Sequence, residues 1–183
     1  MIYFTSDTHF CHNRDFLYGP RGFTNVADMN RAIIKNWNTV ITEDDEVYHL
    51  GDVMLNDNVE GARCLKQLNG KIHIICGNHD TEERLKLYEN CHNVVEVCYG
   101  RPLRFQKYHF FLSHYPTIVS NFDYHKPLAQ RTINLCGHSH TSDPFQDWDV
   151  GVIYHVELDA HNNYPISILD VLDNLYDKFA ETH

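Results

Sequence analysis

Five short polar motifs carry the side chains of this sequence that could bind metal ions. They are Asp7-Thr8-His9, Gly51-Asp52, Gly77-Asn78-His79-Asp80, Ser113-His114 and Gly137-His138-Ser139-His140. Carboxylate and amide oxygens combined with imidazole nitrogens, without thiolates, suit divalent ions such as Mn, Fe, Co, Ni or Zn. Any one motif alone would be an ordinary turn, a helix cap or a hydrogen-bonded histidine. Five in order, each directly after an apolar segment, have no such explanation.

The number of candidate ligands predicts more than one ion. Seven residues have suitable donor atoms: Asp7, His9, Asp52, Asn78, His114, His138 and His140. They are too many for one such ion, but they suit two ions about 3.5–4 Å apart that share a bridging carboxylate and promote phosphoryl displacement. Within Asp7-Thr8-His9, the i, i+2 spacing puts two side chains on one side of an extended segment, and His138-Ser139-His140 repeats it. Each pair can therefore converge on the same ions.

Apolar and β-branched segments precede the motifs and are predicted to be strands. The predicted strands cover residues 2–5, 46–50, 71–76, 94–99, 108–112, 132–136, 150–156 and 165–168. Helical spacing of apolar residues predicts helices around residues 29–37, 62–68, 85–88 and 169–179. Strands alternating with helices in the first half indicate βαβ units, and the later strands indicate a further sheet. Open α/β sheets bind ligands at the carboxyl ends of their strands, which is where the motifs lie.

Length and charge restrict the function classes. We expect one domain over residues 1–183, with long loops at 15–25 and 121–130. The formal net charge of −10 argues against a basic face that neutralises long nucleic acid. A small phosphate ester remains a possible substrate, because bound metal ions add positive charge that the sequence count omits.

The N-terminal residues and the cysteine spacing bear on the cellular compartment. The N-terminal residues lack a secretory n-region, and no apolar run is long enough to span a bilayer, so we expect a cytoplasmic protein without membrane contact. The six cysteines contain no CxxC pair, and several end apolar runs. We expect reduced, mostly buried thiols rather than disulfides or a cysteine-rich zinc site.

The motifs read in order as DxH, GD, GNHD, a lone His and GHxH. This set resembles the calcineurin-like metallophosphoesterase superfamily over about residues 1–168, and the text around the motifs is similar to small stand-alone members from bacteria and phages. The resemblance implies an α/β (α+β) fold: a four-layer α/β/β/α sandwich of two mixed sheets flanked by helices. It places the site in loops at the strand ends.

The resemblance also implies a role for each motif residue. Asp7, His9 and His140 would hold one divalent transition-metal ion. Asn78, His114 and His138 would hold a second, and Asp52 would bridge the two. A metal-bound hydroxide would be the nucleophile. His79 would face the substrate and aid the leaving group, while Asp80 would orient His79.

One departure from the family concerns phosphate binding. The larger protein phosphatases follow GD with a further Asp and an Arg that binds phosphate, whereas residues 51–57 contain no Arg. Protein phosphatase activity is therefore not expected. Arg14 and Arg21, in the loop after the first motif, could contact the phosphate or leaving group instead, and His12 lies in the same loop. The alternative is that all three are solvated loop residues.

Several further residues near the motifs have open roles. His49 is either a partner that orients a ligand or a hydrogen-bonded core histidine. Asp147, Asp149 and Asp159 are expected to be turn residues or partners of ligands rather than ligands. Aromatic residues that could line a substrate pocket, with core packing as the default, include Tyr115, Phe122 and Tyr124.

The leading hypothesis is a dinuclear metal-dependent phosphoesterase that hydrolyses a small or nucleotide-derived, including cyclic, phosphodiester. The alternatives are a phosphomonoesterase, a nuclease acting on short single strands or RNA ends, and a metal-binding scaffold without catalysis. The sequence lacks clusters of Lys and Arg interleaved with aromatics, which disfavours the nuclease. The complete ligand set disfavours the scaffold.

Overall fold

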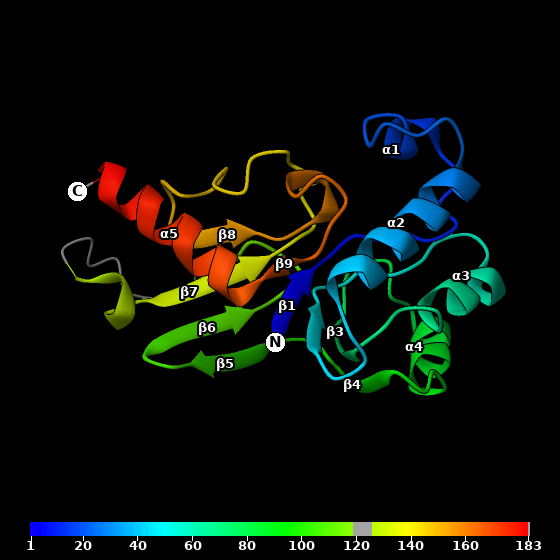
Figure 1. Ribbon diagram of the computed structural model, residues 1–183, viewed down its shortest axis with the longest axis horizontal. Coiled ribbons are helices and arrows are strands. Elements are labelled where there is room, and N and C mark those ends of the chain that lie inside the picture. Colours follow the sequence, from blue (N-terminus) through cyan, green and yellow to red (C-terminus); the bar gives the residue numbers. More distant parts are fainter. Residues whose placement is uncertain (119–125, 183) are drawn as a thin grey trace.

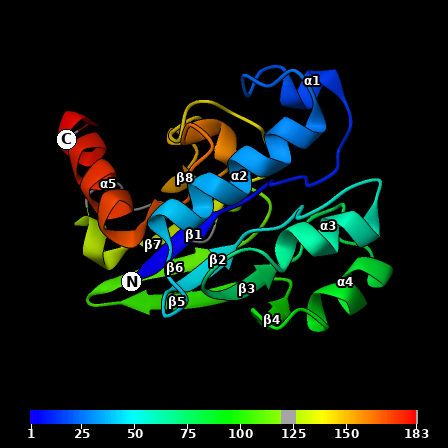
Figure 2. The same ribbon diagram turned by 45° about the vertical axis from the view of Figure 1, so that its right-hand side comes forward.

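The computed structural model describes residues 1–118 and 126–182, and it arranges them in four layers (Figure 1). Two β-sheets pack face to face, and helices cover their outer faces (Figure 2). The predicted α/β/β/α sandwich of two mixed sheets is therefore confirmed.

The first sheet has five strands in the order β4-β3-β2-β1-β9. The first four strands of the chain are parallel: β1 (Ile2–Thr5), β2 (Glu46–His49), β3 (Lys71–Ile75) and β4 (Val94–Cys98). The fifth, β9 (Ile166–Ser167), runs antiparallel to β1. Neighbouring residues in β2 pack on opposite sides, since Val47 faces the helical layer and Tyr48 faces the second sheet. Burial on both faces explains the nearly continuous apolar pattern of this strand.

Three helices cover the outer face of the first sheet. They are α2 (Val26–Val40), α3 (Asn58–Leu65) and α4 (Glu82–Glu89). The apolar side of α2, with Met29, Ile33 and Trp37, packs into the core formed with the sheet. The Asn25 side chain caps α2 by accepting a hydrogen bond from the backbone N–H of Asp28 at 2.9 Å. Asp57 caps α3 in the same way.

The second sheet has four strands in the order β5-β6-β7-β8. These are β5 (Arg101–Phe105), β6 (Tyr108–Leu112), β7 (Thr132–Cys136) and β8 (Ile153–His155). Only the β5–β6 pair is antiparallel among these neighbours. Helix α5 (Ile168–Thr182) packs against this layer, where the Asn174 amide donates to the Tyr154 hydroxyl at 2.8 Å.

Several local features differ from the sequence predictions. β5 was not expected, because its alternating exposed positions and Pro102 are typical of an edge strand with a weak apolar signal. The predicted loop at 15–25 contains a short helix, α1 (Asp15–Tyr18), and the loop at 121–130 includes the 3-10 turn Leu128–Gln130. A second 3-10 turn, Leu158–Ala160, follows β8. Phe122 and Tyr124 lie outside the described residues.

Two expectations from composition can be compared with the structure. All six cysteines are free thiols, and five of them are buried. Within residues 1–118 and 126–182, none of the helices has both the length and the apolar character needed to cross a membrane.

Candidate metal centre

The parallel strands bring the five motifs to one edge of the sandwich. Asp7 follows β1 and Asp52 follows β2, and the Asp7 backbone N–H donates to the carbonyl of Gly51 at 2.9 Å. In the second sheet, the Gly137 N–H donates to the carbonyl of His114 at 2.9 Å. These loop contacts join motifs that lie far apart in the sequence.

Asp7, His9 and His140 form the first group of candidate ligands. The His9 Nε2 and His140 Nε2 atoms lie 3.1 Å apart, and Asp7 Oδ1 lies 3.5 and 3.6 Å from them respectively. Two ligands each about 2.1 Å from one ion lie roughly 3.0 Å apart when they subtend a right angle at it. The spacing of this group therefore fits a metal ion.

Asn78, His114 and His138 form the second group. Asn78 Oδ1 lies 2.9 Å from His114 Nε2 and 3.0 Å from His138 Nδ1, and the two ring nitrogens are 3.2 Å apart. Because all three atoms converge, this group has the same fit as the first.

Asp52 lies between the two groups. Its Oδ2 atom is 3.7 Å from His9 Nε2 and 3.6 Å from His114 Nε2. Its other oxygen, Oδ1, accepts a hydrogen bond from the backbone N–H of His79 at 2.8 Å. One carboxylate oxygen is thus fixed by the protein, and the other faces donors of both groups.

The hydrogen bonds around the ligands orient their free atoms toward these positions. Asp7 Oδ2 accepts from the Ser6 hydroxyl at 2.6 Å and from the His138 N–H at 2.9 Å. Asp7 Oδ1 is buried and has no hydrogen-bond partner among the described residues. His114 Nδ1 lies 2.7 Å from the Leu50 carbonyl, to which it donates, and this leaves the lone pair on Nε2. A cation would satisfy these atoms.

The pKa shifts of three ligands agree with metal binding, whereas two go the other way: burial raises the pKa of Asp52, and the Asp159 carboxylate raises that of His140 despite its burial. Burial lowers the pKa of His9, and burial together with nearby His114 lowers that of His138. Burial would raise the pKa of the Asp7 carboxyl, but the neighbouring imidazoles, His9 first, lower it. Neutral imidazoles and ionised carboxylates are the forms that ligate metals.

Five of the seven candidate ligands adopt left-handed backbone conformations. Their φ angles are 56° for Asp7, 46° for His9, 57° for Asp52, 74° for His138 and 50° for His140. The paired ligands do converge, but their backbone is left-handed and not extended as the sequence predicted. Non-glycine residues rarely adopt such angles, because each left-handed residue costs about 1–3 kcal/mol. Strained residues of this kind cluster at functional sites.

Two motif glycines permit the close approach of the loops. A Cβ atom at Gly77 would lie 2.2 Å from Asp52 Oδ1, and one at Gly137 would lie 2.4 Å from Asp7 Oδ2. Any larger residue would displace a carboxylate of the site. The glycines are thus required by packing against the ligands themselves.

Comparison with known families agrees with this geometry. Residues 1–156 match the calcineurin-like phosphoesterase superfamily domain. The chain belongs to this superfamily. The match ends at residue 156, and one domain over residues 1–183 remains a prediction.

Two individual proteins that are similar to this chain are informative. An uncharacterized protein of Methanocaldococcus jannaschii is 40% identical over 126 residues, which cover 67% of this chain and 64% of that protein. The chain thus matches less than two thirds of this relative's length. The crystal structure of a protein of unknown function from Aquifex aeolicus has a TM-score of 0.71 at 25% identity, covering 94% of this chain and 98% of that one. That likeness supports the fold of this superfamily member.

His79 lies beside Asp52 and the first ligand group. Its side chain is 42% exposed, its Nε2 is 3.9 Å from Asp52 Oδ2, and its ring centroid is 5.6 Å from that of His9. The Arg84 guanidinium donates to its carbonyl oxygen. The position allows the ring to face a ligand that is held between the groups.

The contacts of Asp80 differ from the role that the family resemblance implies, which is to orient His79. Its Oδ2 accepts from the backbone N–H groups of Asp52 and Gly77, at 2.7 and 2.8 Å. Its Oδ1 accepts from Val53 N–H at 3.2 Å and from the Tyr88 hydroxyl at 2.6 Å. Four donors occupy the carboxylate, and the His79 ring is not one of them. Asp80 instead fixes the two loops that carry Asp52 and Asn78.

The structure separates the three basic residues that were expected to contact substrate. The Arg21 guanidinium is buried, and it pairs with Asp159 through Nε at 3.0 Å and Nη2 at 2.7 Å. A substrate contact by Arg21 is therefore not supported. The His12 ring centroid lies 5.3 Å from that of His9, and Arg14 is exposed at the start of α1.

None of the four histidine and aspartate residues with open roles belongs to a ligand group, and two of them, Asp159 and His49, contact the ligand motifs. Asp159 Oδ2 lies 3.1 Å from His140 Nδ1. His49 Nε2 lies 2.9 Å from the Thr8 hydroxyl, between the two ligands of the first motif. Asp147 pairs with buried His155 at 2.9 Å, and Asp149 is exposed. The hydrogen bond from Ser6 to Asp7 was not predicted, because neighbouring residues of a regular strand point to opposite faces of the sheet.

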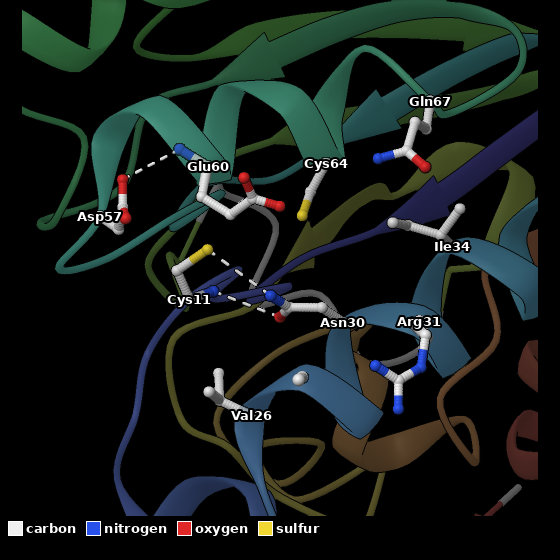
Figure 3. A pocket seen from close by; sticks show the side chains of 10 residues that line it. Cys11, Val26, Asn30, Arg31, Ile34, Asp57, Glu60, Cys64 and Gln67 are labelled. Atoms are coloured by element: carbon white, nitrogen blue, oxygen red, sulfur yellow. Dashed lines mark hydrogen bonds between the residues drawn. The ribbon is translucent and has the colours of Figure 1, made fainter.

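A separate cleft of about 460 Å³ lies between α2 and α3 (Figure 3). None of the seven candidate ligands lines it. Here the Asn30 side chain accepts from the Cys11 backbone N–H at 3.2 Å and donates to Cys11 Sγ at 3.5 Å. Cys11 has a φ of 67°, so Asn30 fixes the strained loop that follows His9.

Proposed function

We propose that this phosphoesterase is a dinuclear metal-dependent phosphodiesterase that acts on a small or nucleotide-derived, including cyclic, diester. The observation that carries the proposal is the position of Asp52, whose Oδ2 lies within 3.7 Å of a histidine from each ligand group. Such an oxygen is suited to bridge two neighbouring divalent ions. The mixed nitrogen and oxygen donors suit Mn, Fe, Co, Ni or Zn.

The ligand groups and His79 divide the chemistry between them. When bound, two divalent ions supply a nucleophilic oxygen from water and stabilise the charge on the phosphoryl group. His79 supplies a proton or a positive charge to the leaving oxygen, because its ring is partly exposed and lies beside Asp52 and His9. The hydrogen bond from its backbone to Asp52 fixes the ring relative to the bridging carboxylate.

The charges near the groups favour a diester over a monoester. A monoester dianion requires more cationic partners than a diester monoanion, and Arg21 is already paired with Asp159. Exposed Arg14 and half-buried His12 are the remaining proposed contacts from the first loop. The net charge of −10 further disfavours a nuclease that binds extended strands.

Tyr115 is a candidate contact for the organic part of the diester. Its side chain is half-exposed, and its ring centroid lies 4.8 Å from that of His138 and 5.1 Å from that of His114. An exposed aromatic ring beside the second group suits a planar substituent, as in a nucleotide-derived ester.

A substrate panel tests the proposal. The chelated protein is supplied with Mn, Ni, Co or Zn and assayed on bis-p-nitrophenyl phosphate, p-nitrophenyl phosphate, cyclic nucleotides and short oligonucleotides at two salt concentrations. We expect metal-dependent hydrolysis with higher kcat/KM for the small diesters. A preference for p-nitrophenyl phosphate would favour the phosphomonoesterase. A strong, salt-sensitive preference for longer strands would favour the nuclease, and inactivity with both ions bound would favour the scaffold.

A further inference from the structure

We propose that Asp159, held in place by Arg21, is a positioning residue that sets the affinity of the first ligand group for its metal ion. The inference rests on the proposed function, because it requires that Asp7, His9 and His140 bind an ion. It concerns two residues that the family motifs do not include.

The contact between Asp159 and His140 fixes the ligand atom of that histidine. Asp159 Oδ2 accepts from His140 Nδ1 at 3.1 Å, and the carboxylate is largely buried. With the proton on Nδ1, the lone pair on Nε2 faces Asp7 and His9. The His140 side chain is 34% exposed, whereas that of His9 is 2% exposed. His140 thus has less packing to hold it and depends more on a hydrogen-bond partner.

Arg21 connects this partner to the backbone of the first motif. Its guanidinium binds both oxygens of Asp159, and Nη2 also donates to the carbonyl of Asp7 at 2.7 Å. Nη1 donates more weakly to the carbonyl of Thr8 at 3.4 Å. One buried cation therefore positions the backbone of one ligand and the carboxylate that orients another. Two-point pairing of this kind is rigid, which a lysine would not reproduce.

The charged support belongs to the first group. His114, in the second group, donates from Nδ1 to the neutral carbonyl of Leu50 at 2.7 Å. A carboxylate partner makes a histidine a stronger ligand than a neutral partner does. Loss of the Asp159 charge should therefore weaken the binding of the ion in the first group and leave the binding of the other ion nearly unchanged.

A second histidine–aspartate pair in the same chain provides a matched control. Asp147 Oδ2 lies 2.9 Å from Nε2 of buried His155, and His155 is in neither ligand group. Asp147→Asn makes the same chemical change as Asp159→Asn. Only Asp159→Asn alters the partner of a candidate ligand.

The test is calorimetric titration of the chelated 183-residue chain with Mn²⁺, for wild type, Asp159→Asn and Asp147→Asn. The melting of each metal-free protein is measured in parallel. We expect Asp159→Asn to weaken one of two binding steps about 10- to 100-fold. Asp147→Asn should keep both steps at wild-type affinity. Two variants that keep the charge of the side chain, Arg21→Lys and Asp159→Glu, should weaken the same binding step. They serve as the test if Asp159→Asn fails to fold.

The outcomes separate this inference from the proposed function. If wild type binds two ions and every folded Asp159 variant binds both with unchanged affinity, the positioning role is wrong while the proposed function stands. If both steps weaken equally with a lowered metal-free melting temperature, Asp159 has a general structural role instead. If wild type binds no ion, the proposed function fails, and the inference fails with it.

Discussion

Asp80 Oδ2 accepts a hydrogen bond from the backbone N–H of Asp52 at 2.7 Å, so a motif carboxylate holds the loop of the candidate bridging ligand. The same oxygen accepts from Gly77 N–H, which precedes Asn78. The GNHD motif thereby joins the loops after β2 and β3, and its aspartate acts on backbone geometry rather than on the His79 ring.

Removal of Asp80 should therefore destabilise the fold as well as the site. Asp80→Ala leaves buried backbone donors of Asp52, Val53 and Gly77 without their acceptor, and we expect a loss of at least about 3 kcal/mol in unfolding free energy. Tyr88→Phe removes one donor and should lose about 1–2 kcal/mol. Urea unfolding measures both. An Asp80→Ala protein as stable as wild type but inactive would instead indicate a direct role at His79.

His79 should contribute to hydrolysis without holding metal. We expect His79→Ala to reduce kcat on bis-p-nitrophenyl phosphate by roughly 10²-fold or more, in the range of general acid catalysis, with metal content unchanged. The control is His92→Ala, since His92 is exposed and distant in sequence from the motifs. Full activity of His79→Ala with intact metal content would rule out the proposed role.

Gly77 should tolerate no side chain. Gly77→Ala places a Cβ 2.2 Å from Asp52 Oδ1, so that the carboxylate must move and metal binding should fall by at least tenfold. At Gly151 the nearest atom to an added Cβ is 3.8 Å away, and Gly151→Ala should bind metal as wild type does. Calorimetric titration of both variants compares them. Equal affinities would show that the loops adjust freely.

Buried His49 should make the metal-free protein sensitive to acid. Burial lowers the pKa of His49 to about 4 from an ordinary value near 6.5, so the folded state favours the neutral ring. Its contribution to stability is present above pH 6.5 and is lost as the pH falls toward 4, by up to about 3 kcal/mol. Urea unfolding between pH 6.5 and 4 should show a steeper loss for wild type than for His49→Gln. Parallel curves would contradict the assignment.

The strands and ligands of the site were predictable because their signals are local. β6 and β7 have the predicted bounds, since each is a short apolar run ended by polar residues. The ligand types and number predicted two ions, and the resemblance that the motifs carry implied the two groups that Asp52 separates. These features depend on residues within a few positions of one another and on the topology of parallel strands.

The supporting contacts were not predictable, because they join residues that are distant in sequence. Arg21 reaches Asp159, which lies 138 positions later, and no local pattern distinguishes that pair from solvated loop residues. Asp80 is saturated by donors from another loop and from α4, which only the folded chain brings together. The left-handed φ of residues such as Asp7 likewise follows from the tertiary structure, since propensity disfavours it.

The metal content of wild type and Asp52→Asn tests the bridged metal centre most directly. Both proteins are chelated, reconstituted with Mn²⁺ or Zn²⁺ and freed of unbound ions. Their bound metal is then measured by inductively coupled plasma mass spectrometry. Because Asp52 Oδ2 faces histidines of both groups, we predict about two ions per chain in wild type and no more than about one in Asp52→Asn. Wild type with no bound ion, or Asp52→Asn with an undiminished pair, would contradict the bridged metal centre.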